Sequence, residues 1–183
     1  ISACAKQGEL TLACDAYKMM SSRHVQPDSL TYLSLMNVYA TAGNTLKKAL
    51  MEPLSEAKRV HFMTRMLALF EEAQSKELLT TAIFNVLLKG ISWIGTLDHL
   101  SLVFPLTSSE PLPVIPDCIS YTIAISCASY CDGGSGSSFL LAEEYFAQMK
   151  RNLFNGDSTK IPKEVILSML ICYKMSIIAE PKS

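Results

Sequence analysis

Two glycines in the same sequence context, Gly8 and Gly43, lie 35 residues apart and constrain the fold more than any other feature. Each follows an apolar stretch that is typical of a helix and has a small residue near its end. After Gly8, a second amphipathic stretch runs over Glu9–Ser22 and is followed by Pro27-Asp28. Two helices of this size cannot bury their apolar faces alone, so such units must stack on one another. The sequence therefore predicts an all-α solenoid of helix-turn-helix repeats, with the glycines at the turns between paired helices.

An aromatic residue near the start of each repeat unit allows the same repeat to be followed along the rest of the chain. Gly95 follows Phe84 by 11 residues, the same offset that separates Tyr32 from Gly43. We expect four to five units, over residues 1–28, 29–80, 81–117, 118–163 and 164–183, in which the last two open at Tyr121 and at Leu167 as its equivalent. The first helix of the fifth unit is expected over Lys163–Ile178. Unequal unit lengths predict a helical extension at Thr45–Phe62, a flexible linker at Asp132–Ser138, and a turn-rich loop at Leu153–Ile161.

Composition limits the function. The 183 residues include 16 basic and 17 acidic side chains, so the net charge of −1 is not that of a protein that holds nucleic acid by bulk electrostatics. The longest apolar run, Val165–Ile178, is interrupted by Lys174 and is shorter than the roughly 20 residues that cross a bilayer. The six cysteines form no C-x-x-C pair, and no catalytic triad can be phased onto one surface. We expect no membrane span, no metal or other cofactor, and no enzymatic activity. Because the chain starts within a repeat, we expect it to be an excerpt of a longer protein.

The order of these features resembles the pentatricopeptide repeat (PPR) family. The matching residues are those of the first unit: Gly8, Ala13, Tyr17, Met20, Pro27 and Asp28. The tetratricopeptide repeat is the nearest alternative, but its unit is shorter by one residue and its signature is not matched. The resemblance implies a non-enzymatic binder of single-stranded RNA that acts in transcript processing, stability or translation in mitochondria or chloroplasts.

The resemblance also implies which residues contact RNA. In the family, each base is read by the residue after the opening aromatic and by the last residue of the unit, and it is stacked between the second residues of neighbouring units. The third unit offers Asn85 and Asp117 as reading residues, with Ala82 and Ile119 as the stacking pair. Asn followed by Asp is the family's pairing for uracil. The alternative is that Asn85 is an exposed polar residue and Asp117 an N-cap of the next helix.

The remaining positions depart from the family's code. The other reading positions carry Asp28, Leu33, Thr80, Thr122, Lys163 and Ser168, and Lys6 fits the lysine that contacts phosphate in the family. Leu33 has no polar group with which to read a base edge, and Thr122 with Lys163 gives no clear base. Two alternatives to RNA binding therefore stay open. One is a structural PPR subunit of an organellar ribosome, and the other is a helical-repeat scaffold whose insertions contact protein partners.

Overall fold

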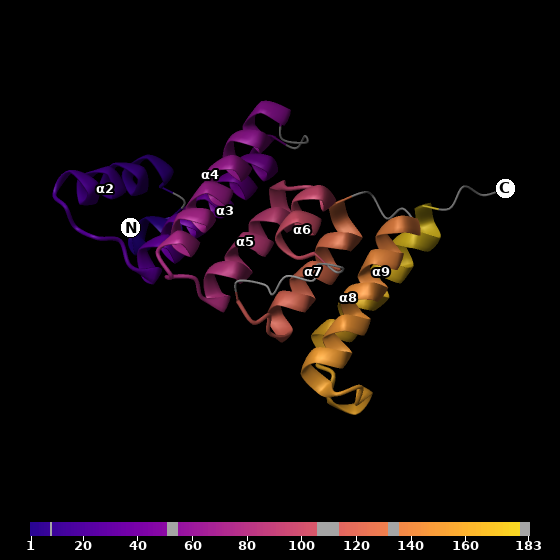
Figure 1. Ribbon diagram of the computed structural model, residues 1–183. Coiled ribbons are helices and arrows are strands. Elements are labelled where there is room, and N and C mark those ends of the chain that lie inside the picture. The colour runs from indigo at the N-terminus through magenta and orange to yellow at the C-terminus, as the bar shows by residue number, and fades with distance from the viewer. Residues whose placement is uncertain (8, 51–54, 106–113, 132–135, 180–183) are drawn as a thin grey trace. The chain divides into compact units, whose positions relative to one another are not determined.

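The computed structural model describes residues 1–7, 9–50, 55–105, 114–131 and 136–179, and every regular element in these ranges is helical (Figure 1). The prediction of an all-α chain is therefore confirmed for this part of the sequence. The elements are α1 (Ser2–Gln7), α2 (Leu10–Ser22), α3 (Ser29–Leu50), α4 (Glu56–Ser75), α5 (Thr81–Ile94), α6 (Leu97–Val103), α7 (Cys118–Cys131), α8 (Gly136–Phe154), the 3-10 turn η1 (Ser158–Lys160) and α9 (Lys163–Ala179).

The chain forms two compact units, Ile1–Ile94 and Gly95–Ser183, and each is described by itself. In the first unit, α3 contacts α1, α2, α4 and α5, and α5 also contacts α4. Helices α3 and α5 run in the same direction, because Ser29 Oγ donates to the Leu78 carbonyl at 2.9 Å near their starts, and Gly43 meets Ile94 near their ends. Helix α3 thus contacts both α4, which follows it in the chain, and α5, which runs parallel to it.

A carboxylate joins three helices of the first unit. Glu72 Oε1 on α4 accepts hydrogen bonds from the Tyr17 hydroxyl of α2 and the Tyr32 hydroxyl of α3, each at 2.9 Å, and from Lys76 Nζ at 2.8 Å. Burial favours the neutral form of Glu72, but these three hydrogen bonds outweigh burial and hold the pKa of the carboxyl below its ordinary value. Ala13, one turn before Tyr17 on α2, is fully buried.

The second unit is built around an aromatic cluster. Helix α7 contacts α6, α8 and α9, and α8 also contacts α9. The Phe104 ring lies 5.2 Å from the rings of Tyr121 on α7 and Tyr145 on α8, measured between centroids. The buried Tyr145 hydroxyl donates to the Phe104 carbonyl at 2.6 Å, and burial raises its pKa. Ala142, also on α8, is fully buried, as Ala13 is in the first unit.

The opening aromatics occupy equivalent places at the starts of three helices. Tyr32, Phe84 and Tyr121 are each the fourth residue of their helix, and each is buried. Leu167 does not match them. Helix α9 begins directly after Pro162, which makes Leu167 its fifth residue, and its side chain is 59% exposed. The equivalence expected for Leu167 is therefore wrong, although the helix itself was expected over nearly the same residues.

The glycine prediction is correct at one position and wrong at another. Gly95 lies between α5 and α6, as expected of a turn, and Gly8 lies outside the described residues. Gly43 lies inside α3, which continues to Leu50. A Cβ atom at Gly43 would be 2.8 Å from Ile94 Cδ1 and 3.5 Å from Phe62 Cγ, so the residue lets two neighbouring helices approach rather than making a turn.

The insertions extend helices more than they add loops. Of Thr45–Phe62, the described residues extend α3 and begin α4, in agreement with the expected helical extension. Gly136–Ser138 belong to α8, so the linker predicted over Asp132–Ser138 is wrong there, and residues 132–135 lie outside the described part. The loop predicted over Leu153–Ile161 is confirmed from Asn155 on, where Asn155 and Gly156 have positive φ angles of 49° and 83°, but Leu153 and Phe154 still belong to α8. None of the described helices is long and apolar enough to cross a membrane.

Candidate nucleic-acid interface

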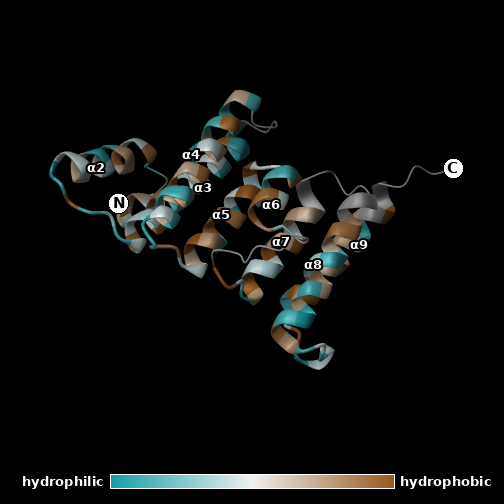
Figure 2. Cartoon of the chain, viewed as in Figure 1, coloured by the Kyte–Doolittle hydropathy of each residue, from teal (hydrophilic) through white to brown (hydrophobic). Residues whose placement is uncertain are grey.

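The accessible side of α3 and α5 forms what we call the open face. It comprises Leu30, Leu33, Asn37 and Thr41 on α3 and Ala82, Asn85, Lys89 and Ser92 on α5, all of them exposed or partly exposed. Their spacing of three to four residues places them along one side of each helix, while the opposite sides form the core. In Figure 2, α5 is hydrophobic over most of its length, and Asn85 and Lys89 are among its few polar residues.

Acidic residues are absent from both helices of the open face. Helices α3 and α5 contain no Asp or Glu, and they carry Lys47, Lys48 and Lys89. The short helix α1 and the second unit's α7 also have no acidic residue. Within the described helices of the first unit, the carboxylates lie on α2 and α4: Asp15, Glu56, Glu71 and Glu72. Helices α2 and α4 also carry Lys18, Lys58, Arg59 and Arg65, so their charges balance, whereas α3 and α5 carry positive charge alone.

An aromatic ring with two lysines lies at the edge of the open face. Lys89 Nζ is 4.6 Å from the centroid of the Trp93 ring, and Lys47 Nζ donates to the Trp93 carbonyl at 2.8 Å. Lys89 is one turn after Asn85 on the same side of α5, and Trp93 is one turn further. Lys89 and Trp93 were not predicted as RNA contacts from the sequence, although their spacings of four and eight residues from Asn85 place them on the same side of the helix. Together they combine a stacking surface with positive charge.

The four residues of the expected uracil site are divided between the two compact units. Asn85, partly exposed, and Ala82, exposed, lie on α5 in the first unit. Ile119, 60% exposed, and Asp117 lie at the start of α7 in the second. Asp117 Oδ1 accepts from the Ser120 backbone N–H at 2.8 Å and from its hydroxyl at 3.0 Å, and Ser120 Oγ accepts from the Asp117 N–H at 3.1 Å. Asp117 is therefore an N-cap, as the alternative interpretation expected.

Asp28 forms the same kind of N-cap at the start of α3. Its Oδ1 accepts from the Thr31 backbone N–H at 2.7 Å and from the Thr31 hydroxyl at 2.6 Å. These hydrogen bonds, that of the hydroxyl above all, lower the pKa of Asp28. Thr80 caps α5 more weakly, since its Oγ1 accepts from the Ile83 N–H at 3.3 Å. Asp28, Thr80 and Asp117, the last residues of the predicted repeat units, thus cap the helices that follow them.

The other expected RNA contacts are engaged within the protein or lie outside the described atoms. The Thr122 hydroxyl donates to the Cys118 carbonyl at 2.7 Å, one turn earlier in α7. The Ser168 hydroxyl donates to the Glu164 carbonyl at 3.0 Å and accepts from Ser126 Oγ at 3.1 Å. The side chain of Lys6 lies outside the described residues.

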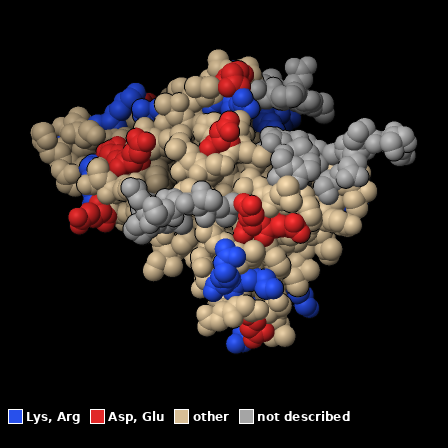
Figure 3. All heavy atoms as spheres, turned by 45° about the vertical axis from the view of Figure 1, so that its right-hand side comes forward, with Lys and Arg blue, Asp and Glu red and all other residues tan. Residues whose placement is uncertain are grey.

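Charge is sparse on the face drawn in Figure 3, where acidic and basic side chains form small separate groups on a mostly uncharged surface. Over the part of the chain with described side chains, no three His, Cys, Asp or Glu residues gather as a metal site. In comparisons with models of known protein families and with curated protein sequences, the chain matches neither a family model nor a curated sequence.

Proposed function

We propose that the chain binds single-stranded RNA through the open face. It acts as a non-enzymatic repeat protein of PPR type, in transcript processing, stability or translation in mitochondria or chloroplasts. The observation that carries the proposal is the sign of the charges: the charged residues of α3 and α5 are all lysines, whereas α2 and α4 each carry as many acidic as basic residues. A phosphate chain lying along the open face meets no like charge on these two helices. Protein surfaces that bind single strands combine such positive charge with side chains on which bases stack.

The second residues of α3 and α5 support base stacking. Leu30, 58% exposed, and Ala82 occupy equivalent positions on two helices that lie side by side and run in the same direction. A base placed between them is flanked by Leu33, which has no polar group with which to read a base edge, and by Thr80, whose Oγ1 accepts from the Ile83 N–H, so we expect this position to accept any base. Asn85 is different, because an asparagine side chain carries both a hydrogen-bond donor and an acceptor. We assign to Asn85 the preference for uracil.

Fluorescence anisotropy with a labelled, unstructured RNA of about 12 nucleotides tests the proposal across a range of salt concentrations. If Lys48 and Lys89 each neutralise one phosphate, log K falls with log[salt] with a slope of about −1.4. Lys89→Gln should reduce this slope by about half. Lys58→Gln, at an exposed position on α4, is the matched control and should leave the slope unchanged. Binding that does not respond to Lys89→Gln, or no binding at low salt by folded protein, contradicts the proposal.

One observation favours the alternative of a structural subunit or protein scaffold. Along one side of α9 in the second unit, five large apolar side chains are 45–59% exposed: Ile166, Leu167, Leu170, Tyr173 and Ile177. Exposed apolar residues gathered in this way are typical of surfaces that contact protein. Folded protein that binds no RNA at low salt would support this alternative, and an RNA complex that forms as described above would count against it as the main function.

A further inference from the structure

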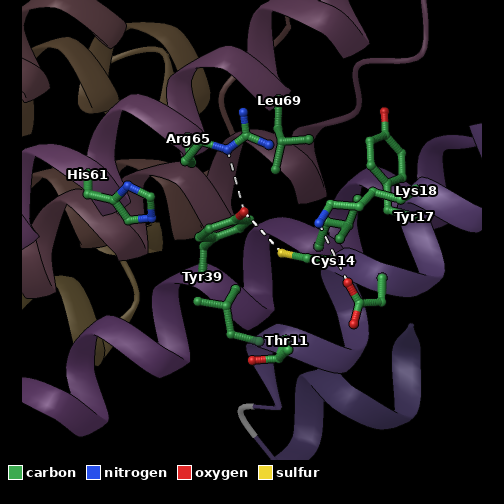
Figure 4. Close-up of a pocket in the computed structure, with 11 residues that line it drawn as sticks. Thr11, Cys14, Tyr17, Lys18, Tyr39, His61, Arg65 and Leu69 are labelled. Carbon is green, nitrogen blue, oxygen red and sulfur yellow. Dashed lines mark hydrogen bonds and ion pairs between the residues drawn. The ribbon is translucent and has the colours of Figure 1, made fainter.

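A cavity of about 390 Å³ lies between α2 and α4 with its floor on α3 and α4, all within the first unit (Figure 4). The floor consists of the buried side chains of Leu35, Tyr39 and Leu69. The rim is polar and exposed, with Thr11 on α2 and Arg65 on α4. A volume of this size, with an apolar floor and a few convergent polar groups, is typical of a small-molecule site.

The floor of the cavity positions the Arg65 side chain. Arg65 Nε donates a hydrogen bond to the Tyr39 hydroxyl at 3.5 Å, and this hydroxyl also pairs with Cys14 Sγ at 3.2 Å. Burial raises the pKa of Tyr39, so the hydroxyl stays neutral near pH 7. Figure 4 shows both contacts converging on the Tyr39 oxygen from helices on either side. The guanidinium is therefore held at the cavity by one of its nitrogens, while its two terminal amino groups remain for a ligand.

Arg65 has no carboxylate partner among the described residues, where the four ion pairs involve other side chains. The single carboxylate that lines the cavity, Asp15, pairs instead with Lys18 at 3.6 Å. His61 lies one turn before Arg65 and also lines the cavity. A planar guanidinium without an acidic partner is suited to a carboxylate or phosphate group, which it can bind through two parallel hydrogen bonds.

We propose that this cavity binds a small organic anion. Its carboxylate or phosphate group binds the Arg65 guanidinium, and its apolar body covers Leu35 and Leu69. The site is independent of RNA binding. Leu35 and Tyr39 each follow a residue of the open face, Leu33 and Asn37, by two positions, which is about 200° around an α-helix. The ligand and the RNA therefore contact opposite sides of α3.

Isothermal titration calorimetry with three probes of similar size tests the site: 1-naphthoate, 1-naphthyl phosphate and the neutral 1-naphthylmethanol. Both anions should bind at least tenfold more tightly than the alcohol, and the tighter of the two identifies which acidic group the site prefers. Arg65→Gln should remove this advantage. Arg59→Gln is the matched control, because Arg59 lies on the same helix, pairs with Glu56 and does not line the cavity. Equal binding of anions and alcohol, or an unchanged advantage in Arg65→Gln, overturns the proposal.

A second variant tests the cavity while leaving Arg65 unchanged. Thr11→Trp, at an exposed position on the rim, should fill the cavity and abolish binding of both anions while circular dichroism shows the helices intact. RNA binding by this variant should be unchanged, so failure of this site and failure of the proposed RNA function are distinguishable. Naphthoate binding that survives Thr11→Trp would place the anion elsewhere and contradict the proposal.

Discussion

Replacing the two capping aspartates with alanine should weaken the fold by different amounts, although the two caps have the same geometry. Asp28→Ala and Asp117→Ala each remove a side-chain acceptor from a backbone N–H, at 2.7 Å from Thr31 and 2.8 Å from Ser120. Loss of an N-cap typically costs about 0.5–2 kcal/mol. Asp28 is exposed, so water can replace its carboxylate, and we expect about 0.5–1 kcal/mol there. Ser120 is fully buried, so its N–H loses an acceptor that water cannot easily replace, and we expect about 2 kcal/mol for Asp117→Ala.

Urea denaturation followed by circular dichroism at 222 nm measures this difference. Asp117→Asn is the matched control, because asparagine caps a helix about as well as aspartate, and its free energy of unfolding should stay within a few tenths of a kcal/mol of the original. The two compact units can unfold in separate transitions, in which case each variant should shift the transition of its own unit. If Asp117→Ala cost no more than Asp28→Ala, or if Asp117→Asn cost as much as alanine, the capping argument would be wrong.

Three further predictions concern packing, pH and recognition. Ala13→Leu and Ala142→Leu add volume at fully buried positions and should each lower the free energy of unfolding by about 1–3 kcal/mol, measured by thermal or urea unfolding. Lys58→Ala should leave it nearly unchanged. An unchanged melting temperature in the Ala13→Leu and Ala142→Leu variants would refute the packing described at these positions. The pKa of Glu72 is lowered in the fold, so the stability that its carboxylate contributes is complete above about pH 4.5 and is lost as the pH falls through the lower folded pKa. Glu72→Gln should therefore reduce the loss of stability between pH 4.5 and lower pH. An unchanged loss of stability in this range would contradict the prediction. Asn85→Ala should erase a preference for uracil at one RNA position without changing the helical content, and equal affinity for all four bases before and after the change would refute the assignment.

Local signals made the helix starts predictable from the sequence. The Pro-Asp pairs, the Ser or Thr three residues after each Asp, and the aromatic one residue further interact across a single helical turn, as Asp28, Thr31 and Tyr32 do. Such contacts depend on nearby residues alone. The small residues Ala13 and Ala142 were predictable for a similar reason, since their place in the helical period already indicated a buried side.

Features that depend on distant residues could not be read in the same way. Gly43 was expected at a turn, but its role is set by Ile94 and Phe62, which the chain brings to it from far along the sequence. The cavity depends on Arg65 reaching the Tyr39 hydroxyl, 26 residues away, and on an apolar floor formed by α3 and α4 together. The lack of carboxylates on α3 and α5 became visible only with the helix boundaries, because a net charge of −1 says nothing about where the charges lie.

The most direct test of the central claim is to locate RNA on the protein. The complex with an unstructured RNA containing 4-thiouridine is crosslinked with near-ultraviolet light, digested and mapped by mass spectrometry. We predict crosslinks within residues 29–50 and 81–94, the helices of the open face, with those on α5 weakened by Lys89→Gln. Crosslinks confined to residues 10–22 and 56–75, the helices α2 and α4, would contradict the claim that this protein binds RNA through α3 and α5.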